Sequence, residues 1–237
     1  MTTEPLPLQA WLIHKTPTGD TSLRLRFFTR EKGLLDCYYR GARTAKKTAA
    51  LQPFTPLWLL LNERHHWFYV KSLENAGLPL TLTGPSLFAA LYVNELIFHT
   101  LTPQEHDERL FSAYQNTLNK LETAKQQSAI EISLRHFEKE LLTACGYSLS
   151  FTTEANSTTP IKPTACYQYS AGDGFKENET GIPGHHLLAM AADNFEDAAV
   201  LKTAKKIMRH AINHLLGGRQ LKSRALYVAT TTVSNVD

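Results

Sequence analysis

The first third of the chain alternates hydrophobic and polar residues with the period of a β-strand. Leu23, Leu25 and Phe27 alternate with arginines, as expected for a strand with one buried face. Gly33 then ends a short polar segment and can take the positive φ of a tight hairpin. The same reasoning predicts strands over residues 10–14, 34–39, 53–61 and 67–73. Five short strands within residues 1–80 indicate a small barrel, for which the OB-fold is the candidate.

Beyond residue 80 the hydrophobic residues recur with the period of a helix. The connector LPLTLTGPS separates the two patterns, and its Ser86 is expected to cap the first helix. Helices are predicted over residues 86–100, 105–125, 128–145 and 195–216, and Gly146 is expected to end the third. Residues 148–184 lose this period, which predicts an irregular insertion with one hairpin near residues 167–175. The predicted fold class is therefore α+β, with an OB-fold domain over residues 1–80 and a helical-bundle domain over residues 81–237.

The net charge of +3 conceals a segregation of charge along the chain. No acidic residue lies between Asp36 and Glu63, a window that holds four basic residues. None lies between Asp197 and Asp237 either, a window that holds seven of the chain's 25 basic residues. Aromatic residues flank the first window on both sides, and such a segment suits a polyanion with flat bases, which is a nucleic acid. The alternative is a solvated lysine-rich loop, which composition alone does not exclude.

Other features of the sequence argue against a secreted, membrane or catalytic protein. Three scattered cysteines are too few for a disulfide framework and fit reduced thiols, and the first residues do not resemble a signal peptide. The longest apolar run, residues 57–61, is too short to span a membrane. We therefore expect a cytoplasmic protein. The sequence has no GxxxxGK[ST] phosphate loop, no HExxH zinc motif and no cluster of carboxylates, so neither ATP use nor enzymatic activity is expected.

Four motifs, in this order, resemble the RecO family of bacterial DNA repair and recombination mediator proteins. They are RGAR with the later LQPFTPL (residues 40–57), LYVNELI (91–97), LRHFEKELLTACGY (134–147) and LGGRQLKSRALY (216–227). The resemblance implies an N-terminal OB-fold, a helical domain and an irregular insertion. It also implies a protein that binds single- and double-stranded DNA and anneals complementary strands. Such a protein assists the loading of RecA onto DNA coated by single-stranded-DNA-binding protein.

The resemblance also implies partners, a location and a possible cofactor. Family members bind RecR and the acidic C-terminal tail of single-stranded-DNA-binding protein, act on the RecA filament indirectly, and work at the bacterial nucleoid. Many members hold zinc on four cysteines in the insertion. In this chain residues 148–184 contain a single cysteine, Cys166, and the sequence has no CxxC; the alternative is a zinc site made by Cys145, Cys166, His185 and His186. We therefore expect no cofactor and no metal site.

Charge and the resemblance together assign residues to DNA contact. Cations along a groove neutralise phosphates, and aromatic faces stack bases without reading their sequence. In the first window we assign contacts to Arg40, Arg43, Lys46 and Lys47, with Tyr39 as the stacking residue. Contacts from the strand face are assigned to Arg24 and Arg26, with plain solvent exposure as the alternative. The second set consists of Lys205, Lys206, Arg209, Lys222 and Arg224. Ion pairs with acids of the helical domain are the alternative for Lys222 and Arg224, which belong to the fourth motif.

The acidic tail of single-stranded-DNA-binding protein ends in a phenylalanine preceded by aspartates, so it needs an apolar slot rimmed by cations. The resemblance places this slot on the helical domain, where we assign Arg135 first and Lys139 and Arg109 after it. The alternative for Arg135 is an ion pair with Glu131 or Glu138. Two further functions compete with DNA mediation. One is an adaptor that bridges RecR and this tail without touching DNA. The other, an RNA-binding translation factor, rests on the OB-fold alone.

Overall fold

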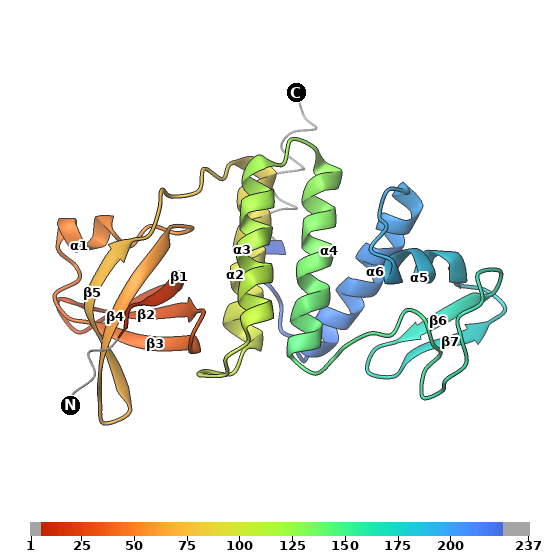
Figure 1. Cartoon of the computed structure of the whole chain (residues 1–237), viewed down its shortest axis with the longest axis horizontal. Coiled ribbons are helices and arrows are strands. Elements are labelled where there is room, and N and C mark those ends of the chain that lie inside the picture. Colours follow the sequence, from red (N-terminus) through yellow and green to blue (C-terminus); the bar gives the residue numbers. More distant parts are fainter. Residues whose placement is uncertain (1–5, 225–237) are drawn as a thin grey trace. The chain divides into compact units, whose positions relative to one another are not determined.

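The computed structural model describes residues 6–224, apart from the side chains of Ala45 and Lys46. The chain divides into two compact units, with the division between Glu122 and Thr123. The first unit begins with five strands: β1 (Leu8–Thr18), β2 (Ser22–Thr29), β3 (Gly33–Tyr39), β4 (Pro56–Arg64) and β5 (Trp67–Asn75). They close into a barrel in the order β1-β2-β3-β5-β4 (Figure 1). Neighbouring strands are antiparallel except β3 and β5, which pair in parallel. The predicted OB-like barrel is confirmed.

The alternation of the sequence decides which side chains fill this barrel. Leu25, Phe27, Leu35 and Cys37 are buried together in its interior, each two residues from the next on its strand. Helix α1 (Ala45–Ala49) connects β3 to β4, in a segment that the sequence predicted as a loop. Ala42 and Leu51, on either side of α1, are fully buried in the same core, so this connection closes one end of the barrel.

Two helices complete the first unit, α2 (Gly84–Thr100) and α3 (Glu108–Thr123). The ring of Phe28 on β2 lies 5.3 Å from Phe111 and 5.6 Å from Tyr114 of α3, so the helices cover part of the outer face of the barrel. The Tyr114 hydroxyl donates to Asn94 Oδ1 of α2 at 2.6 Å, which satisfies two buried polar groups. Ser86 was wrongly predicted as the helix cap. The helix begins at Gly84 with a proline in its first turn, where a missing N–H costs nothing, and Ser86 is buried inside it.

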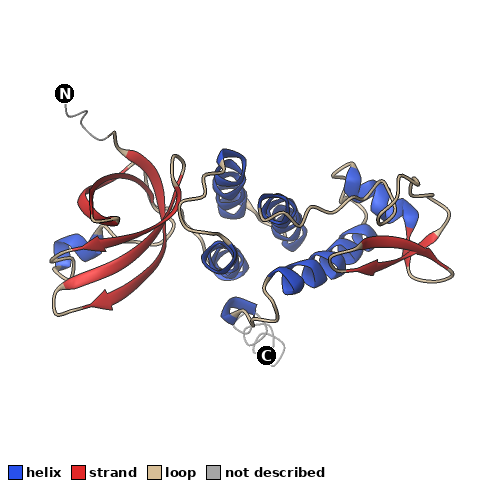
Figure 2. Cartoon of the chain, turned by 90° about the horizontal axis from the view of Figure 1, so that it is seen from below, coloured by secondary structure: helices blue, strands red, loops and turns tan. Residues whose placement is uncertain are grey.

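The second unit combines three helices with a small sheet. The helices are α4 (Gln127–Ala144), α5 (Gly184–Ala191) and α6 (Ala198–Leu215), and the strands are β6 (Cys166–Ser170), β7 (Gly174–Asn178) and β8 (Ile182–Pro183). The sheet has the order β7-β6-β8 and lies beside α6 (Figure 2). Strands β6 and β7 are the predicted hairpin, whereas β8 and α5 were not predicted. Gly146 ends α4 as expected, with a φ of 79° and a hydrogen bond from Tyr147 N to Leu142 O at 2.7 Å.

Candidate nucleic-acid interface

A group of exposed and half-buried aromatic and basic side chains follows the parallel seam between β3 and β5. Successive side chains of a strand point to opposite faces, so the neighbours of buried Cys37 and Phe68 point outward. Register brings Tyr38 of β3 opposite Tyr69 of β5 and opposite Arg24 of β2. We call this surface the seam face, and it consists of Arg24, Tyr38, Arg40, Trp67 and Tyr69.

The rings of the seam face touch one another and carry a cation. Tyr38 lies between two rings, with its centroid 5.4 Å from that of Trp67 and 5.9 Å from that of Tyr69. Trp67 is 48% exposed, and the Arg40 guanidinium lies 5.0 Å from the Tyr69 centroid. Exposed rings offer stacking surfaces for bases, and cations beside them can neutralise phosphates. The arrangement therefore suits a nucleic acid strand.

One carboxylate, Asp36, lies on the same side of the barrel and is held by two arginines. Arg26 donates two hydrogen bonds to Asp36, from Nε to Oδ1 at 2.9 Å and from Nη2 to Oδ2 at 2.7 Å. The Arg26 guanidinium also lies over the Phe98 ring. Arg24 makes a single 3.2 Å contact with Asp36, and its side chain stays 49% exposed. Of the two predicted strand-face contacts, Arg24 is thus the more accessible, and Arg26 forms a partly buried ion pair.

The ion pair between Asp36 and Arg26 should make the free energy of unfolding depend on pH. Burial alone would raise the pKa of Asp36, but the hydrogen bond and charge of Arg26, with a smaller effect of Arg24, lower it below its usual range. A carboxyl group with a lowered folded pKa stabilises the fold above its unfolded pKa of about 3.9, and this contribution disappears as the pH falls through the folded value. We therefore expect Asp36→Asn to be less stable than the unmodified protein at neutral pH. The difference in unfolding free energy should shrink below about pH 4, and a constant difference would contradict this account.

The residues of the first basic window also hold the barrel together. Arg43 donates to the Asp20 carbonyl at 3.0 Å and so ties the segment before α1 to the β1–β2 turn. Lys47 donates to the Arg40 carbonyl at 3.1 Å, and its ammonium lies 4.6 Å from the Tyr39 centroid. Lys46 belongs to α1, and its side chain lies outside the described part of the structure.

Tyr39, assigned to stacking from the sequence, has a different position from Tyr38. It packs against the barrel core, and burial raises the pKa of its hydroxyl. Lys47 lies over one face of Tyr39, whereas Tyr38 lies on the seam face next to the exposed ring of Trp67. Sequence reasoning missed Tyr38, Trp67 and Tyr69 as candidates. The period-two spacing of Trp67 and Tyr69 around buried Phe68 was the available signal.

The second basic set lies on α6 and just after it, in the second unit. Lys206 and Arg209 are exposed, as is the neighbouring Lys202. Lys205 forms a 2.7 Å ion pair with Glu131 of α4. Burial alone would raise the pKa of Glu131, but the hydrogen bond and charge of Lys205 lower it below its usual range. After the helix, Arg224 donates to Asn213 Oδ1 at 2.6 Å, and Lys222 is exposed.

The residues assigned to tail binding differ in exposure. Arg135 is only 6% exposed and pairs with Glu138, its Nη2 lying 2.9 Å from Oε1, which is the ion pair considered as its alternative. Lys139 pairs with Asp193 at 2.7 Å and remains partly accessible. Arg109 belongs to α3 in the first unit and is exposed.

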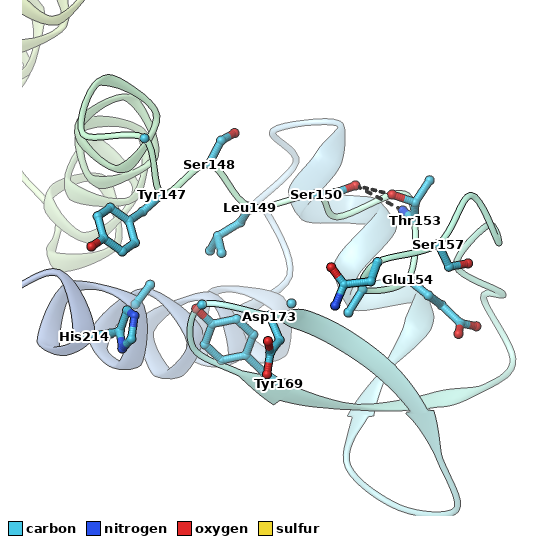
Figure 3. Close-up of a pocket in the computed structure, with 16 residues that line it drawn as sticks. Tyr147, Ser148, Leu149, Ser150, Thr153, Glu154, Ser157, Tyr169, Asp173 and His214 are labelled. Carbon is cyan, nitrogen blue, oxygen red and sulfur yellow. Dashed lines mark hydrogen bonds between the residues drawn. The ribbon is translucent and has the colours of Figure 1, made fainter.

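The second unit also contains a cavity of about 410 Å³ between the end of α4, the β6–β7 turn and α6. Tyr147, Tyr169 and His214 lie around it (Figure 3), and the Tyr147 and His214 rings are 5.7 Å apart. Its charged lining residues are Glu154 and Asp173, with neither lysine nor arginine among the described residues that line it. This lining suits a phosphate poorly. Within residues 6–224, no group of three or more His, Cys, Asp or Glu side chains is placed to hold a metal ion.

The chain is an α+β protein. It has an OB-like barrel with cationic and aromatic side chains on its outer face, followed by helices and a small second sheet. The chain belongs to the RecO family. The sequence model described as the N terminal of recombination protein O matches residues 6–77, and the model described as its C terminal matches residues 83–225. The family predicted from the four motifs is thus confirmed.

Curated relatives match over nearly their whole length. A protein named DNA repair protein RecO from Legionella pneumophila strain Philadelphia 1 is 52% identical, over 93% of this chain and 96% of the relative. Proteins of the same name from Klebsiella pneumoniae and from Escherichia coli O139:H28 are each 37% identical, over 92% of this chain and at least 91% of the relative. In the described part of the chain, no helix is long and apolar enough to cross a membrane.

Proposed function

We propose that this protein is a DNA repair mediator that binds single- and double-stranded DNA and anneals complementary strands without acting as an enzyme. The observation that carries the proposal is the seam face, where the exposed Trp67, two half-buried tyrosines and two exposed arginines lie together on the barrel of a RecO-family chain. The names of the relatives support the setting of DNA repair.

Annealing requires a protein that holds a strand by its backbone and leaves the pairing edges of its bases free. Arginine and lysine contacts to phosphates release counterions and favour binding of any sequence. Stacking on a ring engages the face of a base and leaves its hydrogen-bonding edge available to a second strand. Arg24 and Arg40 beside Tyr38 and Tyr69 provide both kinds of contact. The exposed cations of α6, Lys206 and Arg209, are proposed to hold further phosphates.

We extend the proposal to the partners that the family resemblance implies. The protein would assist loading of RecA onto DNA coated by single-stranded-DNA-binding protein, together with RecR. The acidic tail of the coating protein would need accessible cations. Lys139, in the second unit, meets that requirement better than Arg135, because Arg135 is buried against Glu138 whereas Lys139 stays partly accessible beside Asp193. Arg109, in the first unit, is exposed.

An annealing assay with purified protein tests this function directly. Two complementary labelled single strands are mixed with the protein in the absence of nucleotide and metal ions. We expect faster duplex formation than in its absence, because charge neutralisation lowers the repulsion between the strands. An unchanged rate of duplex formation would contradict annealing. If the protein also failed to bind either form of DNA but bound a labelled acidic tail peptide, the adaptor function would replace the proposal.

A further inference from the structure

We infer that the three rings of the seam face form a stacking step for unpaired bases, so that this surface distinguishes a single strand from a duplex. The inference rests on the proposed DNA binding and deepens it by naming the class of DNA that the seam face takes. Trp67 is assigned as the outermost ring of the step, with Tyr38 and Tyr69 behind it.

The exposure of Trp67, compared with that of Trp11, supports this assignment. Trp11 is buried under the helices and contacts Tyr114, as a structural tryptophan does. Trp67 is among the most exposed large hydrophobic side chains of the described chain, although its ring contacts that of Tyr38. A large ring that lies next to another ring and still faces solvent offers an unused stacking surface.

Electrostatics favour a strand at this place over other aromatic ligands. Arg40 lies over Tyr69 at one side of the step, and Arg24 lies opposite Tyr38 on the next strand. Asp36, a carboxylate on the same side of the barrel, contacts Arg24 at 3.2 Å and has Arg26 as its bidentate partner. A phosphodiester beside the rings would therefore meet cations whose competing anion is already paired with Arg26.

The turn that leads into Trp67 is held in an unusual conformation. His65 and His66 connect β4 to β5, and both have positive φ, 50° and 65°. Two-residue hairpins of this kind most often use Asn-Gly or a similar pair, and histidine is among the few other residues enriched at positive φ. Here the tight turn fixes Trp67 as the first residue of β5, beside Tyr38.

Single strands and duplexes should respond differently to loss of this ring. Stacking of a base on an aromatic side chain strengthens single-strand binding by roughly 5-fold to 150-fold, whereas the bases of a duplex are already stacked and paired. The stacking contribution does not release counterions. It should therefore change the affinity of a single strand at every salt concentration without changing the slope of its salt dependence.

The experiment compares Trp67→Leu with the matched control Trp58→Leu, which removes a 38% exposed tryptophan from the neighbouring strand β4. Binding of labelled oligo(dT) and of a blunt duplex of equal length is measured over a range of salt concentrations. We expect Trp67→Leu to weaken oligo(dT) binding by roughly 5-fold or more at unchanged slope, with duplex binding changed less than about twofold. Trp58→Leu should change neither, and Trp67→Phe should restore most of the single-strand affinity.

A second measurement does not depend on the folding of Trp67→Leu. In a Trp58→Phe protein the remaining tryptophans are buried Trp11 and exposed Trp67, so oligo(dT) should quench fluorescence and the duplex should not. Equal quenching by both, or no quenching by bound oligo(dT), would overturn the stacking step. Equal loss of single-strand and duplex affinity in a folded Trp67→Leu protein would also overturn it, while leaving DNA binding intact. If the unmodified protein bound neither DNA, the proposed function and this inference would both fail.

Discussion

Replacing Arg40, Arg43, Lys46 and Lys47 together by glutamine is expected to weaken DNA binding severely and to flatten its salt dependence. On a single strand, each lost phosphate contact lowers the slope of log affinity against log salt concentration by about 0.7, so the loss of four contacts lowers it by about 3. Relative to about 1 M salt, this corresponds at about 0.1 M to a loss of nearly three orders of magnitude in affinity. Binding titrations at several salt concentrations measure both quantities.

A matched control separates local contacts from the overall charge of the protein. Lys125→Gln with Lys176→Gln removes positive charge at two exposed positions outside the proposed contacts and should leave the slope unchanged. Urea unfolding must accompany the test, because Arg43 and Lys47 donate to backbone carbonyls that fix the connection before β4. If the variant with all four substitutions folds and its affinity has the same salt-dependence slope as that of the unmodified protein, the first basic window does not contact DNA.

The sequence predicted the barrel well because the buried positions of each strand can be recognised from the residues of that strand alone. In β2, leucine and phenylalanine at alternate positions are the core residues of the structure, and no distant information is needed to see this. Helix α1 was missed for the opposite reason, since its five residues are too short to express a helical period. The strand predicted from residue 53 begins instead at Pro56, because Phe54 adopts a positive φ of 55° that breaks the extended chain.

The residues of the candidate interface were only partly predictable. Segregation of charge located the basic windows, but it did not reveal that Arg26 is engaged with Asp36 ten residues away. The choice between Tyr38 and Tyr39 depends on strand register, where a shift by one residue exchanges the inner and outer faces. Trp67 contacts Tyr38 only because β5 pairs in parallel with β3, a long-range feature that local patterns do not contain. The sequence therefore indicates which residue types such a surface contains, whereas their arrangement depends on long-range strand pairing.

The largest effect on stability is expected from Gly33→Ala, at the first residue of β3, where the chain leaves the β2–β3 turn. Gly33 has a φ of 66°, a conformation that costs a residue with a Cβ about 1–2 kcal/mol. A Cβ at this position would also overlap the backbone carbonyl oxygen of Glu105, in the connection between α2 and α3. That connection is fixed to β3 by the hydrogen bond from Gln104 N to Leu34 O at 2.9 Å, so it cannot move away freely.

The strain of the backbone and the overlap should add, because they act on the same residue in different ways. We expect Gly33→Ala to lower the free energy of unfolding by about 3–5 kcal/mol, measured by urea denaturation. Gly19→Ala is the matched control, because Gly19 has a φ of 55° and open space where its Cβ would stand. It should cost about 1–2 kcal/mol, the backbone strain alone. Equal losses in the two variants would mean that the contact with Glu105 contributes nothing. A much larger loss in Gly33→Ala would show that this turn joins the barrel to the helices that cover it.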